Sequence, residues 1–252
     1  MKTTHLITRR NAIIAGLAGI GGLALARFKE PLPPTYGNLL RMGDNLTYIA
    51  HRTLLPGQAL VREYGLDDLT SFPATGTTDP AVAKKPVLSD AYRDLRRGDF
   101  TGWRLSVEGR VARPRSFSLA ELKALPRRTQ ITRHTCEEGW TAIGQWTGVP
   151  LSLVLDAVGM LPTACFVVFY SYDDWAAGID LLDALHPQTI LAYGMNGKDV
   201  PIPHGAPVRL RVERQIGYKS MKFLKSIVVK DEFDDGGAKG DIQAGWAWYT
   251  GM

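Results

Sequence analysis

The sequence lacks the residue patterns that mark several common classes of protein. Cys136 and Cys165 are its only cysteines among 252 residues, and two cysteines do not make a disulfide scaffold. It has no Cys-x-x-Cys, His-Glu-x-x-His, Gly-x-x-x-x-Gly-Lys-Ser/Thr or Gly-x-Ser-x-Gly pattern. Zinc fingers, zinc hydrolases, P-loop nucleotide triphosphatases and hydrolases with a nucleophile elbow therefore find no support.

An excess of charge of one sign is also nearly absent from the body of the chain. The formal net charge is +5, but Lys2, Arg9 and Arg10 lie within the first 26 residues, which contain no acidic residue. The rest of the chain therefore gives little support to nucleic-acid binding, and we expect no nucleic-acid partner. An apolar content of 45% predicts a folded globular domain instead.

The chain begins with a pattern typical of export. Arg9 and Arg10 precede an uncharged run at residues 15–26, which is rich in glycine and alanine and short for a membrane span. The run ends in Ala-Leu-Ala, a small-x-small cleavage site. This predicts a twin-arginine signal peptide over residues 1–26 and a periplasmic protein. An ordinary leader, or an uncut leader that anchors the chain in the membrane, are the alternatives.

The segment before the main domain has no long periodic pattern. Residues 27–100 are predicted to form an extended segment that wraps the domain whose core is residues 101–252. Within it, residues 46–52 are predicted as a short strand or turn, and residues 92–97 as a charged, solvated stretch. Residues 72–80 have loop chemistry, and such a loop either lines a functional site or simply wraps the domain.

The main domain shows clear local patterns of strands and short helices. Alternation predicts a strand at residues 103–109, and a Ser-x-x-Glu capping box predicts a helix from residue 118. An Asn-Gly turn predicts a hairpin at residues 190–202. Further strands are expected at residues 129–135, 165–170, 208–212 and 226–230, and short helices at residues 150–158 and 180–185. The strand at residues 165–170 is continuously apolar and is expected to be buried on both faces. We therefore predict an α+β fold with more strand than helix.

Polar chemistry gathers in three short segments. Cys136 follows a β-rich run and precedes a Glu-Glu-Gly-Trp turn, where a thiolate could bind a soft metal, although most free cysteines are simply buried. The second segment, residues 204–209, contains His204 and Arg209. Residues 217–222 (Gly-Tyr-Lys-Ser-Met-Lys) could hold a phosphate, although lysines on a turn are usually only solvated.

Taken together, these segments resemble the sulfite oxidase family of molybdopterin-dependent oxidoreductases. The match runs over residues 103–229 in the family's order and includes residues 135–140, 146–151, 191–197, 204–209 and 217–222. The leader matches the exported bacterial branch, which includes the periplasmic methionine-sulfoxide reductase catalytic subunit. The resemblance implies a mixed, strand-rich molybdopterin-binding domain without the immunoglobulin-like dimerisation domain, and we expect a monomer.

The resemblance also implies a cofactor and residues that hold it. The cofactor would be molybdenum-molybdopterin, with Cys136 as the protein thiolate on the metal. Ser171 would lie near the metal. The other residues expected to contact the cofactor are His51, Arg52, His204, Arg209, Ser220, Met221 and Lys222.

The implied activity is a two-electron oxygen-atom transfer at a sulfur or similar centre. The chain has no Cys-x-x-Cys-His site for covalent haem, so electrons would be exchanged with a separate haem-containing partner, which could be membrane-bound. Glu137 and Glu138 stand just after the cysteine, where animal and plant sulfite oxidases carry arginines, and acids repel an oxyanion. We therefore expect a small-molecule or sulfoxide-type substrate rather than sulfite, with Arg133 as the nearest basic residue to orient it.

Two other functions are compatible with the sequence. An exported binding module could keep the fold without catalysis, since a fold does not fix a function. A thiol-dependent hydrolase could use Cys136 with a histidine such as His134. For the oxidoreductase, the short loop at residues 173–175 predicts a more open pocket that could admit a larger substrate.

Overall fold

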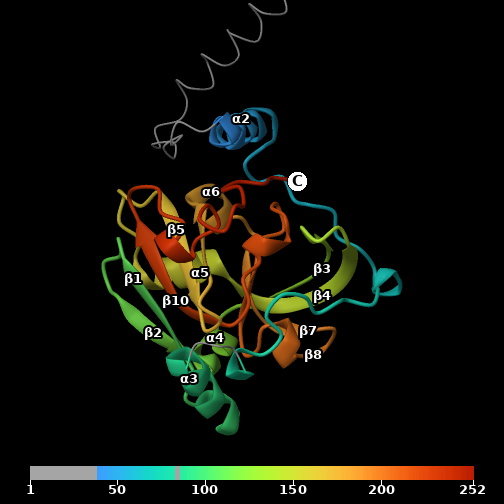
Figure 1. Cartoon of the computed structure of the whole chain (residues 1–252), viewed down its shortest axis with the longest axis vertical. Coiled ribbons are helices and arrows are strands. Elements are labelled where there is room, and N and C mark those ends of the chain that lie inside the picture. Colours follow the sequence, from blue (N-terminus) through green and yellow to red (C-terminus); the bar gives the residue numbers. More distant parts are fainter. Residues whose placement is uncertain (1–38, 83–85) are drawn as a thin grey trace, which may run out of the picture.

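The computed structural model describes residues 39–82 and 86–252, so the predicted signal peptide lies outside the described residues (Figure 1). Two five-stranded sheets dominate it, with the strand orders β2-β1-β10-β5-β6 and β3-β4-β7-β8, the latter extended by β9 on β7. Every strand in this described part of the chain belongs to one of the two sheets. The fold is therefore the strand-rich α+β architecture that the sequence predicts.

The first sheet contains the parallel pair β1–β10, and its other neighbouring strands are antiparallel. Its strands are β1 Arg104–Gly109, β2 Arg115–Ser118, β5 Phe166–Ser171, β6 Ala176–Asp180 and β10 Leu224–Lys230. Five of the six residues of β5 are buried, which confirms the predicted apolar strand with both faces covered.

The second sheet carries the cysteine segment. Its strands are β3 Arg128–Thr135, β4 Thr141–Pro150, β7 Ile190–Met195, β8 Lys198–Asp199 and β9 Arg209–Arg211. β3 and β4 pair without a register shift up to Thr135 and Thr141, so the residues between them form a tight turn. In that turn the Cys136 amide donates to the Trp140 carbonyl at 2.9 Å, and Gly139 adopts a φ of 90°. The fold therefore presents Cys136 at the end of a rigid hairpin.

Short helices connect the strands as their capping residues predict. α4 Leu119–Ala124 begins with the Ser118–Glu121 capping box. α5 Leu151–Val158 ends at Gly159 in the left-handed conformation, and α6 Leu181–Ala184 is capped by the side chain of Asp180. The main hydrophobic core joins both sheets to α5, with members such as Ile227 from β10 and Leu191 from β7.

One prediction for the N-terminal segment is wrong, and another holds only in part. Residues 46–52 lie inside α2 Leu39–Leu54, where Tyr48 packs against Trp248 near the other end of the chain. Residues 92–97 lie in α3 Pro86–Arg97, where the charged side chains reach solvent as predicted. Tyr92 of that helix, however, is fully buried, with its hydroxyl donating to the Ala206 carbonyl at 2.6 Å. In both helices a tyrosine is buried by partners far away in sequence, which a local pattern does not reveal.

The proposed boundaries at residues 26 and 100 stay predictions. Short 3-10 turns occur between α2 and α3, at Leu66–Asp68 and Pro80–Val82. Across residues 39–82 and 86–252, none of the helices has the length and apolar content that crossing a membrane requires.

Candidate active site

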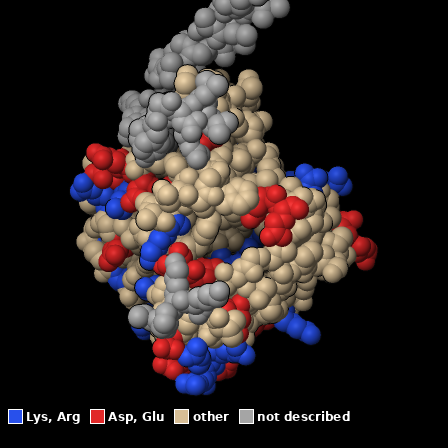
Figure 2. All heavy atoms as spheres, in the orientation of Figure 1, with Lys and Arg blue, Asp and Glu red and all other residues tan. Residues whose placement is uncertain are grey.

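A cavity of about 360 Å³ opens between the end of β3, the loop at residues 72–77 and the segment at residues 217–222. Figure 2 shows this face of the molecule hollowed near its middle, with basic side chains in the hollow and acidic ones beside it. The volume lies in the range of small-molecule and cofactor sites. The cavity is therefore the candidate active site.

Cys136 lies in the wall of this cavity and is 5% exposed. Its sulfur is 4.0 Å from the hydroxyl of Thr75 and 3.5 Å from a carboxylate oxygen of Glu137. Burial, together with the negative charge of Glu137, raises the pKa of the thiol above its usual value. Without a cation the sulfur is therefore a protonated thiol, whereas coordination to a metal deprotonates it outright.

A basic cluster lies beneath the cavity wall. Arg211 is 1% exposed and forms two hydrogen bonds to Glu213, with Nη2–Oε2 at 2.7 Å and Nε–Oε1 at 3.0 Å. Its Nη1 lies 2.8 Å from Nδ1 of His134. Burial, followed by the charges of Arg211 and Arg209, lowers the pKa of His134 far below its usual value. His134 is therefore neutral, and because its Nδ1 faces Arg211 it does not serve as a general base for Cys136.

Arg209 joins two of the segments that surround the cavity. Its Nη1 donates to the His204 carbonyl at 3.0 Å, and its Nη2 donates to the Ser220 carbonyl at 2.7 Å. Its guanidinium lies over the ring of Trp146, 4.9 Å from the centroid. Burial and the positive charges of Arg209 and Lys222 lower the pKa of His204 to about 4, so His204 is neutral at physiological pH.

Lys222 fixes the loop whose role the sequence left open. Its Nζ donates to the carbonyls of Thr75 at 2.8 Å, of Thr77, and of Pro203 at 3.2 Å. Burial and the charge of Arg209 lower its pKa to about 8. The loop at residues 72–77 thus lines the cavity instead of merely wrapping the domain.

An aromatic cluster completes one side of the cavity. The ring of Phe72 lies 5.2 Å from His134, 5.6 Å from Trp140 and 5.7 Å from His204, measured between centroids. Sequence reasoning gave no site role to Phe72 or Trp140. His134 was considered only as a partner of Cys136 in a hydrolase, but its place in the cavity wall could have been predicted, because residues two apart on a strand share a face.

The structure brings six of the predicted site residues together at the cavity. These are Cys136, His204, Arg209, Ser220, Met221 and Lys222. Two other predicted site residues, Arg133 and Ser171, do not line the cavity. Arg133 is exposed and alternates with His134 along β3, and the Ser171 hydroxyl is bonded to Asp173 and to the Trp175 carbonyl.

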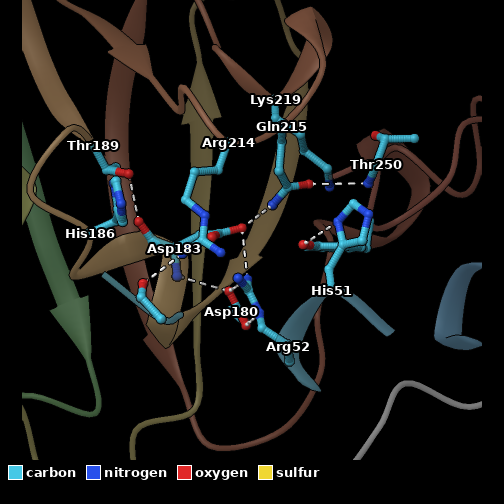
Figure 3. A network of polar contacts seen from close by, with 12 residues as sticks. His51, Arg52, Asp180, Asp183, His186, Thr189, Arg214, Gln215, Lys219 and Thr250 are labelled. Carbon is cyan, nitrogen blue, oxygen red and sulfur yellow. Dashed lines mark hydrogen bonds and ion pairs between the residues drawn. The ribbon is translucent and has the colours of Figure 1, made fainter. Parts of the chain in front are cut away.

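His51 and Arg52 also lie away from the cavity, in a separate buried network (Figure 3). Arg52 donates to both carboxylate oxygens of Asp180, at 2.7 and 3.1 Å, and lies 2.9 Å from Asp183. Nδ1 of His51 lies 3.4 Å from the hydroxyl of Tyr249. These contacts hold α2 against α6 and the C-terminal segment, so the structure gives both residues an anchoring role.

The donors around the cavity suit an acceptor-rich, anionic ligand. Nε of Arg209 and Nε1 of Trp140 are buried and have no hydrogen-bond partner among the described residues. An unpaired buried donor is costly, and a ligand with acceptor atoms removes that cost. A pterin with a phosphate group offers such atoms, and Cys136 offers the thiolate that a soft metal prefers. The residues present therefore fit the cofactor that the sequence predicts.

Comparison with known proteins shows the family to which the fold belongs. Residues 93–237 match the family described as oxidoreductase molybdopterin binding domain, which is more than half of the chain. The chain belongs to this family, and its cofactor is accordingly molybdopterin.

Its relatives include proteins named for sulfoxide reduction. The chain is 38% identical over 174 residues to YedZ1 of Azospira oryzae, named as a protein-methionine-sulfoxide reductase subunit, covering 68% of this chain and 65% of the relative. It is 33% identical over 183 residues to the protein-methionine-sulfoxide reductase catalytic subunit MsrP of Xanthomonas campestris, covering 64% and 53%. The chain thus spans between about half and two thirds of these curated relatives' lengths.

A solved structure shares the fold at lower identity. The sulfane dehydrogenase SoxCD from Paracoccus pantotrophus matches with a TM-score of 0.52 and 21% identity, covering 55% of this chain and 40% of that one. At this identity the likeness concerns the fold alone.

Proposed function

We propose that this chain is the catalytic part of a periplasmic molybdopterin oxidoreductase that reduces sulfoxides by two-electron oxygen-atom transfer. The observation that carries the proposal is the position of Cys136 in the wall of a cavity where two buried donors, Nε of Arg209 and Nε1 of Trp140, lack partners among the described residues. The names of the relatives support sulfur as the reacting centre and reduction as the direction. The overall reaction converts a sulfoxide, two electrons and two protons into a thioether and water.

The residues divide the work between holding the cofactor and shaping the site. Cys136 would bind the metal, and the unpartnered donors of Arg209 and Trp140 would bind acceptor atoms of the cofactor. Lys222 keeps the loop at residues 72–77 closed over the cavity through the carbonyls of Thr75 and Thr77. When bound, the cofactor supplies the oxygen-atom transfer, while the protein supplies a ligand, a shaped cavity and its electrostatic field.

The charge at the cavity favours a neutral substrate. Glu137 and Glu138 both belong to the cavity lining. Carboxylates close to a reacting centre repel a dianion such as sulfite, whereas a sulfoxide carries no net charge. Trp175 and the stacked pair of Tyr218 and Trp246, with centroids 5.3 Å apart, add apolar surface for the rest of the substrate. A sulfoxide on a small molecule or a peptide fits this environment.

The cellular setting is part of the same proposal. The twin-arginine pattern at residues 8–14 supports export to the periplasm, since that route carries proteins already folded. Electrons would come from a separate haem-containing partner, for which a membrane protein is one option. The chain itself would act as a monomer.

The test is a pair of assays on protein purified from its exported form. With a reduced dye as electron donor, we expect the protein to reduce a methionine sulfoxide peptide and to oxidise sulfite slowly or not at all. Cys136→Ala should abolish the sulfoxide reaction. Full activity in that variant, or sulfite oxidation as the faster reaction, would contradict the proposal. Stoichiometric molybdenum without any redox change on sulfur or nitrogen oxides would favour the non-catalytic binding module instead.

A further inference from the structure

The imidazole of His134 is held in one orientation on all sides. The side chain is 7% exposed and lies on β3, on the same face as Cys136. Its ring lies 5.2 Å from Phe72 and 5.4 Å from Trp140, measured between centroids. A Cβ atom on Gly217 would lie only 2.7 Å from Nε2, so any larger residue at this position would collide with the ring.

The contact with Arg211 determines where the imidazole carries its proton. Nη1 of Arg211 lies 2.8 Å from Nδ1, and a guanidinium in a protein only donates. Nδ1 must therefore accept, which places the single proton of the neutral ring on Nε2. Glu213 fixes the guanidinium with two hydrogen bonds and itself accepts from Gln130 at 2.9 Å. The tautomer is thus imposed by a chain of buried side chains.

Nε2 lies at the cavity without a protein partner. His134 lines the cavity, and no hydrogen bond reaches Nε2 from residues 39–82 or 86–252. The segment opposite is the turn Gly217–Lys219, which begins the predicted phosphate-binding segment. Nε2 is not among the buried atoms that lack a partner, so it is open to the cavity, where an acceptor atom of a bound molecule can reach it.

We propose that His134 is a cofactor-binding residue, whose Nε2–H donates a hydrogen bond to an acceptor atom of bound molybdopterin beside Gly217. The inference rests on the proposed function only through the identity of the cofactor. Arg209 and Arg211 lie beneath this part of the cavity, and their positive charge favours an acceptor with negative charge. The positive charge attracts an anionic cofactor more strongly than it attracts a neutral sulfoxide.

Two substitutions of His134 test the roles of its two ring nitrogens separately. In His134→Asn the amide oxygen takes the place of Nδ1 and accepts from Arg211, but nothing donates in the place of Nε2. In His134→Gln the amide nitrogen takes the place of Nε2, but Arg211 loses its acceptor. His186→Gln serves as the matched control, because His186 is also buried and its Nε2 lies 3.1 Å from the Ala59 carbonyl, away from the cavity.

The readouts are molybdenum and pterin per chain after prolonged dialysis, and the thermal unfolding temperature of cofactor-free protein. We expect His134→Asn to lose cofactor roughly tenfold faster than the wild type while its cofactor-free form unfolds at a similar temperature, as a hydrogen bond to a charged group implies. His134→Gln should keep the cofactor and unfold at a lower temperature. Gly217→Ala should lose cofactor as His134→Asn does, because its Cβ displaces the ring.

The opposite order, with cofactor kept in His134→Asn and lost in His134→Gln, would overturn the proposal and leave His134 with a structural role. Full cofactor in both variants, with a raised KM for sulfoxide in His134→Asn, would also overturn it and make the substrate the acceptor. In either case the wild type would still contain molybdenum, so the proposed function would stand. A wild type without molybdenum would overturn both.

Discussion

Two buried polar clusters in this molecule contain similar side chains but do different work. The cavity cluster comprises His134, Arg209, Arg211 and Glu213. The anchoring cluster comprises Arg52, Asp180, Asp183 and Gln215. Both are almost fully buried around their charged groups, and both join residues distant in sequence.

The difference between them lies in charge balance and in what they border. The cavity cluster has two guanidinium groups against one carboxylate and borders a hollow. Both clusters leave buried atoms without a partner in the described part of the chain, namely Nε of Arg209 in the cavity cluster and Nη1 of Arg52 and Oδ1 of Asp183 in the anchoring cluster. The anchoring cluster has two carboxylates against one guanidinium, and its residues line no part of that hollow (Figure 3). An excess of buried positive charge beside a cavity therefore indicates an anionic ligand, whereas an ion-pair cluster that joins elements away from any cavity lining indicates an anchor.

The largest expected effect comes from removing the arginine that faces the cavity. Arg209→Leu should lower bound molybdenum tenfold or more, because the guanidinium holds the His204 and Ser220 carbonyls together and offers its free Nε to the cofactor. Elemental analysis of the purified protein measures this. Arg113→Leu, at an exposed site, is the control and should keep its metal. Full molybdenum in Arg209→Leu would remove the distinction between the clusters.

Removing the arginine of the anchoring cluster should act on stability instead. Arg52→Ala leaves Asp180 and Asp183 buried without their cation, which costs about 3–5 kcal/mol of unfolding free energy. Urea unfolding of cofactor-free protein measures the loss. Arg97→Ala, which removes an exposed ion pair with Asp94, should change stability by less than about 1 kcal/mol. A loss of cofactor from folded Arg52→Ala protein, with stability unchanged, would show that the sequence-based assignment of Arg52 to the cofactor is correct.

The anchoring cluster should also make stability depend on pH. Burial and the neighbouring charge of Asp183 raise the pKa of Asp180 to about 7, well above its value near 4 in an unfolded chain. Between these two values the folded protein binds more protons than the unfolded one, so the contribution of Asp180 to stability falls as pH rises.

Asp183→Asn tests this dependence, since it removes the carboxylate that repels Asp180. Relative to the wild type, the variant should gain stability steadily from pH 4.5 to pH 7.5 in urea unfolding of cofactor-free protein. Asp94→Asn, which changes an exposed carboxylate, should show no such trend. A stability difference that stays constant across this pH range would contradict the raised pKa of Asp180.

The smallest effect is expected at the acidic part of the cavity lining. Changing Glu137 and Glu138 together to glutamine should lower the KM for sulfite severalfold at low salt and leave the KM for a sulfoxide unchanged. Added salt should reduce the difference, because partly exposed charges are screened. Equal effects on both substrates would mean that these carboxylates do not discriminate by charge.

The elements that the sequence predicts correctly are those defined by local chemistry. The Ser118–Glu121 capping box, the Asn196–Gly197 turn and the apolar run of β5 each place their element from a few neighbouring residues. The α2 helix was missed because Tyr48 is buried by Trp248, two hundred residues further along the chain. Helix formation there depends on tertiary packing more than on local propensity.

For the candidate site, too, the residues predicted correctly are those marked by local sequence, and the rest depend on distant contacts. Cys136, His204 and Arg209 were predicted from short segments that follow the family's order along the chain, and all three line the cavity. The role of His134 depends on Arg211, 77 residues away, so no local pattern reveals which nitrogen carries the proton. Arg133 and His134 are neighbours on β3 and point to opposite faces, so His134 lies at the cavity and Arg133 does not. Counting back from Cys136 by the alternation of a strand could have predicted this.

The most direct test of the account is the ligand environment of molybdenum in protein purified from its exported form. We predict about one molybdenum per chain in the wild type, with X-ray absorption showing a sulfur contribution that falls in Cys136→Ser. Molybdenum that is bound with the same sulfur contribution in both proteins would show that Cys136 is not the metal ligand. The cavity described here would then not be the site where the metal is held.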